Sequence, residues 1–249
     1  MEGIKPHTHE DRTKILKKLV PLIKKKFGSN FIALAADGSY ARNEDTDYSD
    51  LELIVFLKKI PKDANWSVRK IMNGLLIEII PDTKISFIEK YLEVSDMWYA
   101  SGAGQLLPIV NNQFIEKINS FKPDNLEKKC WNQAVKRWNQ YQEIASKVLN
   151  NIRQKNKEAI PLVFSQMVKE TLVILSFINT TPYKTLGSYI SQAKRFFIQP
   201  KEFSKLTDIF VNGEYQDLSL LSKVVEDTFS GLEKIFQRKG IKLYFDAIL

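Results

Sequence analysis

Residues 37–53, with the sequence DGSYARNEDTDYSDLEL, contain the pattern that decides the fold. The apolar run Phe31–Ala36 comes before them and predicts a buried strand. The polar stretch Gly38–Ser49 predicts a loop, and the chain becomes apolar again over Asp50–Leu57, which predicts a second strand. The segment therefore predicts two strands joined by a polar loop.

Two carboxylates stand at the start of the second predicted strand. Asp50 and Glu52 are two residues apart, so in an extended chain both point to one face, while Leu51 and Leu53 point into the core. Adjacent carboxylates repel one another unless a cation lies between them. Because carboxylate oxygens together with substrate phosphates are the ligands that Mg²⁺ prefers, the pair predicts a magnesium site.

The turn between the two strands has the composition of a phosphate-binding loop. Gly38 and Ser39 offer backbone N–H groups and a hydroxyl, and Arg42 adds a positive charge. Asp37 comes directly before the turn, and a carboxylate beside a triphosphate is unfavourable unless it points away or joins the metal cluster.

A third acid, Glu78, interrupts the apolar run Leu75–Ile80, which is the third predicted strand. A bare carboxylate is costly on the buried side of such a strand, so Glu78 there needs a partner or a metal. The alternative is a position on an edge strand, facing solvent. The sequence thus offers Asp50, Glu52 and Glu78 as a cluster of three carboxylates.

The remainder of the first half supplies helices for these strands. Apolar residues repeat at helical spacing from Ile15 to Phe27, with Pro21 predicting a kink or a later helix start and Gly28 a helix end. A short helix is expected around Trp66–Met72, between the second and third strands. The order helix, strand, loop, strand, helix, strand predicts an α+β or α/β fold.

After residue 120 the pattern becomes helical. Phe121–Asn125 predicts a hinge, and helices are expected at about 125–155, 161–178, 186–196, 201–211 and 217–239. We therefore predict an α+β domain over residues 1–120, followed by an all-α helical bundle over residues 121–249.

The composition excludes several classes of protein. Cys130 is the single cysteine and is expected to be a small buried apolar residue; with His7 and His9 as the two histidines, a disulfide framework and a Cys- or His-rich metal site are excluded. The net charge of +8 fits anionic partners, but the N-terminal lysines have no aromatic residues among them. We expect those lysines to form a solvated helix face, and we expect no nucleic-acid partner.

No membrane partner is expected either. The most apolar long stretch, Pro161–Thr181, carries Lys169 and Glu170 in its middle and is typical of a buried helix. The N-terminal residues have no hydrophobic signal core, which favours a cytoplasmic location.

The Gly-Ser turn, the Asp-x-Glu strand and a third acid on a neighbouring strand together resemble the nucleotidyltransferase superfamily of the DNA polymerase β type. The chain is similar in particular to the kanamycin (aminoglycoside 4′-O-) nucleotidyltransferase family. The likeness covers almost the whole chain, from the N-terminal helix through Gly38-Ser39-x-x-Arg42, Tyr48-Ser49-Asp50-x-Glu52, Glu78, Glu143-x-Ala145-x-Lys147, Pro161, Gly213-Glu214 and Arg238-Lys239-Gly240.

This resemblance implies a polymerase β-like mixed sheet and Mg²⁺-dependent transfer of AMP from ATP to a hydroxyl of a small molecule. The implied acceptor is above all an aminoglycoside antibiotic, and pyrophosphate is released. The metal ligands would be Asp50, Glu52 and Glu78, and the triphosphate would be held by Gly38, Ser39 and Arg42.

The resemblance also assigns roles to the bundle. Glu143 falls where the family has a general base, and Lys147 where it has a lysine that contacts the nucleotide. The family is homodimeric, with the bundle of one subunit completing the site of the other, so residues 121–249 would bind the acceptor and form the dimer. The residues alone favour the other interpretation, in which Glu143 and Lys147 form an ordinary i, i+4 salt bridge on a helix surface.

The acceptor stays open at the level of the sequence. Aminoglycosides are polycations that need an acidic pocket, and the local acids available for it are Glu44, Asp45, Asp47, Asp82 and Glu89. The alternatives are a lincosamide-like drug, a metabolite or a protein hydroxyl as acceptor, and a non-catalytic nucleotide-binding or interaction protein. The clustered acids favour the active enzyme over the last of these.

Overall fold

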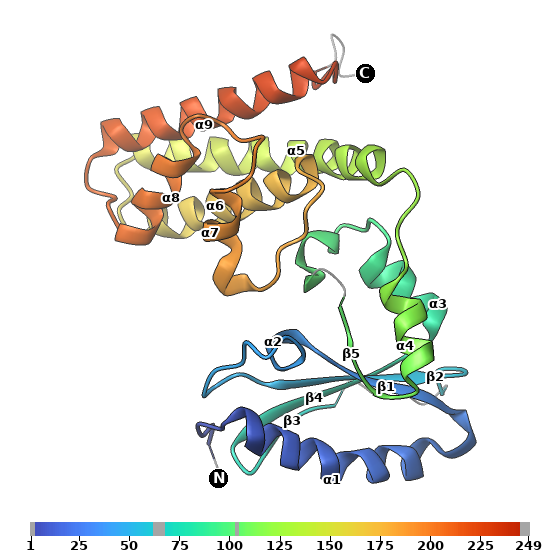
Figure 1. The fold of residues 1–249 in the computed structure, drawn as a ribbon. Coiled ribbons are helices and arrows are strands. Elements are labelled where there is room, and N and C mark those ends of the chain that lie inside the picture. The colour runs from blue at the N-terminus through green and yellow to red at the C-terminus, as the bar shows by residue number, and fades with distance from the viewer. Residues whose placement is uncertain (1–2, 62–67, 103–104, 245–249) are drawn as a thin grey trace. The chain divides into compact units, whose positions relative to one another are not determined.

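A five-stranded mixed sheet forms the centre of the N-terminal half of the chain (Figure 1). The computed structural model describes residues 3–61, 68–102 and 105–244, in two units, Met1–Asp124 and Asn125–Leu249. The strand order is β3-β4-β2-β1-β5, and every neighbouring pair is antiparallel except β2 and β4, which are parallel. The strands are β1 (Phe31–Asp37), β2 (Leu51–Leu57), β3 (Val68–Met72), β4 (Leu75–Asp82) and β5 (Leu107–Val110).

Helices cover both faces of this sheet (Figure 1). On one face, α1 (His9–Phe27) packs its apolar stripe onto buried side chains of β1, β2 and β4. On the other face lie α3 (Lys84–Phe87) and α4 (Asn112–Asn119). There the rings of Phe56 and Phe87 meet edge to face, with their centroids 5.2 Å apart. The sheet is thus buried on both sides, and polar side chains that act on a substrate must lie at its ends.

Pro21 predicted either a kink or a later start of the first helix, but α1 begins at His9, well before Pro21. Thr8 and Asp11 form a reciprocal capping box, which fixes the start of the helix at His9. Pro21 lies inside the helix at an exposed position, where water can reach the carbonyl that the proline leaves without a partner. The predicted later start is therefore wrong.

The segment predicted as a short helix around Trp66–Met72 is a strand instead. Val68–Met72 form β3, which pairs antiparallel with β4, and residues 66–67 lie outside the described part of the chain. Asn73 and Gly74 have φ values of 54° and 85°, as a two-residue hairpin turn requires. The Asn-Gly dipeptide in the sequence indicates this hairpin, so the prediction of a helix in this segment is wrong.

Several other elements of the first unit were not predicted from the sequence. The predicted loop contains a helical turn, α2 (Gly38–Ala41), and neither β5 nor α4 was predicted. Shorter helical turns occur at Gly28–Asn30, Ile88–Leu92 and Trp98–Ala100.

The second unit is helical, as predicted, so the α+β fold with a helical C-terminal region is confirmed. Its helices are α5 (Leu126–Arg153), α6 (Ala159–Ile178), α7 (Tyr189–Ala193), α8 (Phe203–Asn212) and α9 (Leu218–Arg238), with a 3-10 turn at Leu186–Ser188.

The core of this unit is built around aromatic side chains of α5. Trp138 is buried and its ring stacks on Tyr141 at 5.5 Å between centroids, while Cys130 is fully buried, as expected. The helix α6 is long and apolar enough to cross a membrane, but 67% of its most apolar window is buried inside the unit. This agrees with the buried helix predicted for that stretch.

Candidate active site

A row of four charged side chains crosses the sheet at one level. Asp37 on β1 lies opposite Glu52 on β2, Glu52 lies beside Glu78 on β4, and Glu78 lies opposite Arg69 on β3. Residues that are in register on neighbouring strands project from the same face of the sheet, so the four side chains form one continuous row. Asp50 precedes β2 by one residue and adds a further acid to this row.

The structure brings the three predicted metal ligands together. One carboxylate oxygen from each of Asp50, Glu52 and Glu78 lies within 4.8 Å of the other two. Glu78 is on β4, which is an inner strand, so the alternative of a solvent-facing edge strand is wrong. The parallel pairing of β2 with β4 is what places acids from distant parts of the sequence side by side.

The Gly38 turn lies directly against this cluster. Gly38 has a φ of +71°, and a Cβ atom built there would lie 1.9 Å from Oε2 of Glu52. Any other residue would therefore combine backbone strain with a clash against a carboxylate oxygen. Ser39 and Arg42, the other residues predicted to bind phosphate, lie in and just after α2, at the same end of β1.

The acids of the row perturb one another electrostatically. Burial raises the pKa of Glu52 to about 7, helped by the negative charges of Asp50, Asp37 and Glu78. Burial likewise raises the pKa of Asp37, against the opposing effects of the Gly38 N–H and the Arg42 charge. Asp37 thus acts on the cluster through its charge on Glu52, and it caps its own turn by accepting a hydrogen bond of 2.7 Å from the Gly38 N–H.

The donor set fits a hard divalent cation. All of the clustered groups offer oxygen, their charges repel, and the buried members are only partly neutralised by nearby arginines. Arg42 donates through Nε to Glu44 at 2.9 Å, so part of its charge is committed outside the cluster. A Mg²⁺ ion held by Asp50, Glu52 and Glu78 would remove the repulsion among them.

Arg69 is a member of the row that sequence reasoning missed. Its Nη2 donates to both carboxylate oxygens of Glu78, at 2.8 and 2.7 Å. The signal that would have found it is the Asn73-Gly74 hairpin turn, which places Arg69 opposite Glu78 once β3 is recognised as a strand.

A second missed residue, Arg12, holds the loop that leads into Asp50. Its side chain is fully buried, and it donates to the backbone carbonyls of His7, Thr46, Asp47 and Ser49 and to the carboxylate of Asp45. The signal was present in the sequence, because Arg12 shares the apolar stripe of α1 with Ile15, Leu16 and Ile23. A charged residue on a buried stripe needs partners, and the loop supplies them.

Glu143 and Lys147 lie on α5 in the second unit. Both side chains are exposed, at 65% and 57%, and Lys147 Nζ lies 2.6 Å from Glu143 Oε1. The hydrogen bond and charge of Lys147 lower the pKa of Glu143. This is the i, i+4 salt bridge expected from the sequence, and the catalytic roles of the two residues stay predictions.

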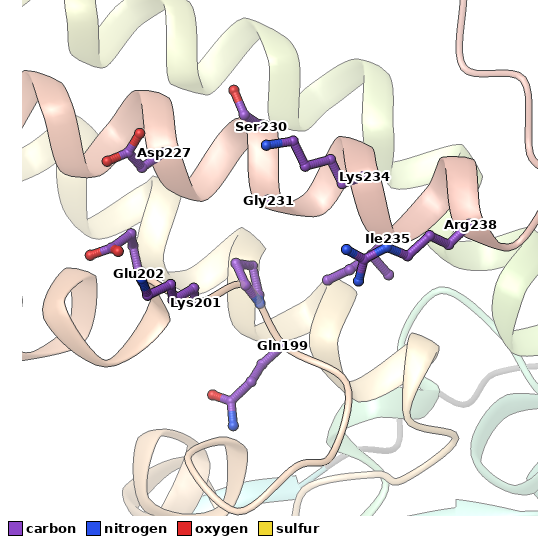
Figure 2. Close-up of a pocket in the computed structure, with 10 residues that line it drawn as sticks. Gln199, Lys201, Glu202, Asp227, Ser230, Gly231, Lys234, Ile235 and Arg238 are labelled. Carbon is purple, nitrogen blue, oxygen red and sulfur yellow. The ribbon is translucent and has the colours of Figure 1, made fainter.

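The second unit also contains a cavity of about 430 Å³ on the surface of α9 (Figure 2). Asp227, Ser230 and Lys234 line it from α9, and Gln199 and Glu202 line it from the segment before α8. Neither Glu143 nor Lys147 lines this cavity. Its wall mixes acids and bases, so its charge points to no single class of ligand.

A mixed sheet whose acids cluster beside a Gly-Ser turn defines the class of the protein as a nucleotidyltransferase. A solved nucleotidyltransferase-like protein of Exiguobacterium sibiricum shares the fold, with a TM-score of 0.50 and 11% sequence identity over 90% of this chain and 75% of that one. The chain belongs to the KNTase family, because residues 118–242 match the model of the KNTase C-terminal domain.

Curated relatives agree with this family. An aminoglycoside nucleotidyltransferase (4′) of Staphylococcus aureus is 22% identical over 239 residues, which are 94% of this chain and 93% of the relative. A Methanocaldococcus jannaschii protein, whose provisional name is protein adenylyltransferase, is 35% identical over 66 residues, 26% of this chain and 44% of that one. The chain is thus an enzyme of nucleotidyl transfer, a reaction that uses a nucleoside triphosphate and, in this class, a divalent metal.

Proposed function

We propose that this protein transfers AMP from ATP to a hydroxyl group of a small molecule and releases pyrophosphate. The observation that carries the proposal is the cluster of Asp50, Glu52 and Glu78, whose oxygens lie within 4.8 Å of one another. Glu52 of this cluster also touches the space beside Gly38, where the phosphates are expected. Carboxylates this close destabilise the fold through their repulsion, and a metal–nucleotide site gives that arrangement a chemical purpose.

The residues of the first unit would bind and orient the nucleotide. Asp50, Glu52 and Glu78 would hold Mg²⁺, which when bound neutralises phosphate charge and stabilises the leaving oxygen. The backbone of Gly38, the hydroxyl of Ser39 and the guanidinium of Arg42 would hold the triphosphate. Catalysis of phosphoryl and nucleotidyl transfer depends mainly on such positioning and charge.

In this proposal Glu143 is the general base. It takes the proton of the acceptor hydroxyl while that oxygen bonds to the α-phosphorus and the bond from the α-phosphorus to the bridging oxygen of pyrophosphate breaks. An exposed glutamate is ionised at neutral pH at its ordinary pKa, so Glu143 can accept a proton, and Lys147 lowers that pKa and makes Glu143 a weaker base. Lys147 would also contact the nucleotide. The enzyme would act as a homodimer, and light scattering measures the molar mass that tests this.

An aminoglycoside is the first acceptor to test, because relatives that span nearly the whole chain carry that name. A specific observation favours a second candidate, a less cationic acceptor such as a lincosamide-like drug, a metabolite or a protein hydroxyl. The acids proposed to attract a polycation are in part engaged elsewhere. Glu44 binds Arg42, Asp45 binds the buried Arg12, and Asp82 is 1% exposed and binds a lysine.

The experiment is Mg²⁺-dependent release of pyrophosphate from ATP in the presence of kanamycin, tobramycin, lincomycin or spectinomycin, with the masses of the products recorded. Asp50→Asn removes a predicted metal ligand without changing side-chain volume. Asp47→Asn is the matched control, because Asp47 is exposed and outside the acid cluster. We expect one acceptor to gain a single AMP with the wild type and with Asp47→Asn, and no product with Asp50→Asn.

The outcomes separate the parts of the proposal. Normal turnover by Asp50→Asn would contradict the metal assignment. No product with any of these acceptors, with Mg·ATP still bound, would contradict the drug acceptors and leave the metabolite and protein acceptors. No binding of nucleotide at all would favour the non-catalytic alternative.

A further inference from the structure

The Arg69 guanidinium binds the carboxylate of Glu78, which is one of the three proposed metal ligands. A single nitrogen, Nη2, donates to both oxygens of the Glu78 carboxylate, at 2.8 and 2.7 Å. Glu78 is one of the three acids whose oxygens lie within 4.8 Å of one another. The Glu78 carboxylate is therefore a ligand for two cations, the guanidinium of Arg69 and the proposed divalent metal ion.

Arg69 is also under the influence of the other two acids. The hydrogen bond and charge of Glu78 raise the pKa of Arg69, and the charges of Asp50 and Glu52 act in the same direction. The contact itself is with Glu78, and the charges of the other two acids only add to it. In the row of charges across the sheet it is the one basic member, at the end opposite Asp37.

The two side chains of this ion pair differ in their freedom to move. The Glu78 side chain is 9% exposed on an inner strand, whereas the Arg69 side chain is 65% exposed on β3, at the edge of the described sheet. Exposed ion pairs are weak and a long arginine side chain has many accessible conformations, so Arg69 can leave without disturbing the core.

We propose that Arg69 competes with the divalent cation for Glu78 and thereby makes metal binding depend on the nucleotide. This inference rests on the proposed metal site. Two cations at one carboxylate repel each other, so the free metal ion binds only if the guanidinium leaves. A nucleoside triphosphate supplies the displaced guanidinium with phosphate oxygens, to which arginine binds well, and so favours the metal-loaded state.

The physical consequence is positive coupling between metal and nucleotide. Arg69 weakens the binding of the metal alone and strengthens the binding of the metal–nucleotide complex. The chain would then take up a divalent cation together with its substrate and leave a free cation in solution. A merely structural ion pair that ties β3 to β4 would also weaken binding of the free metal, but it would leave the effect of the nucleotide on metal affinity unchanged.

The test measures Mn²⁺ binding by calorimetry and by electron paramagnetic resonance, first without nucleotide and then with a non-hydrolysable ATP analogue. Arg69→Gln removes the competing charge. Lys70→Gln is the matched control, because it removes the same charge one residue away, and Lys70 lies opposite Ile77, so that it projects from the other face of the strand. Thermal unfolding of each variant verifies that the fold is intact, and Arg69→Lys keeps the charge without the planar guanidinium.

We expect Arg69→Gln to bind free Mn²⁺ about tenfold more tightly than the wild type, since a nearby cation is gone. The analogue should increase the Mn²⁺ affinity of the wild type and Lys70→Gln several-fold more than that of Arg69→Gln. Arg69→Lys should fall between the wild type and Arg69→Gln in both quantities. Free Mn²⁺ affinity that is equal or weaker in Arg69→Gln than in Lys70→Gln would overturn the inference.

Asp50→Asn distinguishes this failure from failure of the proposed function. If the wild type binds Mn²⁺ and Asp50→Asn does not, the metal site stands, and the comparison of Arg69→Gln with Lys70→Gln judges the inference alone. If Mn²⁺ binds to none of the proteins, or binds Asp50→Asn as tightly as the wild type, the metal site and the inference both fall.

Discussion

The replacement of Arg12 by methionine should destabilise the first unit more than any substitution on the surface of α1. The Arg12 side chain is fully buried and the Asp45 side chain is 2% exposed, with Arg12 Nη1 3.0 Å from Asp45 Oδ2. Methionine fills much of the same space, but it leaves this buried carboxylate with His9 alone, at 2.7 Å. It also removes the guanidinium donor from four backbone carbonyls, of which those of Thr46 and Asp47 keep the N–H groups of Ser49 and His7 as donors.

Breaking a buried ion pair by removing one partner costs about 3–5 kcal/mol. Some of the released carbonyls lie near the surface, where water can replace the guanidinium, so the lower part of this range applies to the pair. We therefore expect Arg12→Met to reduce the free energy of unfolding by about 3–4 kcal/mol, a large fraction of the total stability of an ordinary domain. Arg12→Lys keeps the charge but offers fewer donors in a different geometry, and it should cost about half as much.

The assay is equilibrium unfolding in urea, followed by circular dichroism and by the binding of Mn²⁺ at sub-denaturing urea. Lys14→Met is the control on the same helix, because the Lys14 side chain is 61% exposed and pairs with the exposed Glu10. That variant should unfold at the wild-type urea concentration. A loss of less than about 1 kcal/mol for Arg12→Met would refute the argument that this guanidinium holds the loop before Asp50.

Three further results are expected. Gly38→Ala should abolish Mn²⁺ binding, because its Cβ would lie 1.9 Å from Oε2 of Glu52, whereas Gly213→Ala, with φ +68° and open space, carries only backbone strain and should keep it. Glu143→Gln should lower kcat by about 10²–10⁴ with unchanged Mg·ATP affinity, and an unchanged kcat would leave Glu143 only its salt bridge with Lys147. The raised pKa of Glu52, about 7 against an ordinary 4.5, means that the folded metal-free protein binds a proton more tightly than the unfolded chain, so stability should fall as the pH rises from about 4.5 to 7. Urea unfolding of metal-free protein at pH 5 and pH 8 measures this, and Glu52→Gln should remove that part of the dependence.

The sequence correctly predicted those features that depend on residues close together in the chain. Alternation along a strand predicted that Asp50 and Glu52 share a face and that Leu51 and Leu53 are buried, and both leucines are fully buried. The buried helix at 159–178 and the C-terminal helical region also follow from periodicity within a short window. These features depend on neighbours in the chain and on no distant partner.

The parts that could not be predicted depend on pairing between distant segments. The grouping of Glu78 with Asp50 and Glu52 was predicted, but its position directly beside Glu52 follows from the parallel pairing of β2 with β4, which period-2 alternation in either strand cannot reveal. Arg69 falls in the segment predicted as a short helix, although the Asn73-Gly74 turn is a usable sign of the hairpin that pairs β3 with β4. The helical turn α2 was missed because four residues contain no helical period.

The row across the sheet explains why an acid is tolerated immediately before the Gly-Ser turn. Asp37 lies opposite Glu52, and its charge acts on Glu52 together with those of Asp50 and Glu78, so it adds to the demand for a cation at the cluster. Its own carboxylate accepts a hydrogen bond from the Gly38 N–H, so this N–H can bind a phosphate only when Asp37 releases it. A carboxylate in that position therefore adds charge that favours a cation at the cluster, and it competes with a phosphate for the Gly38 N–H. The same argument predicts a shared requirement for positive charge across the whole row, of which Arg69 supplies one unit and a divalent metal would supply two.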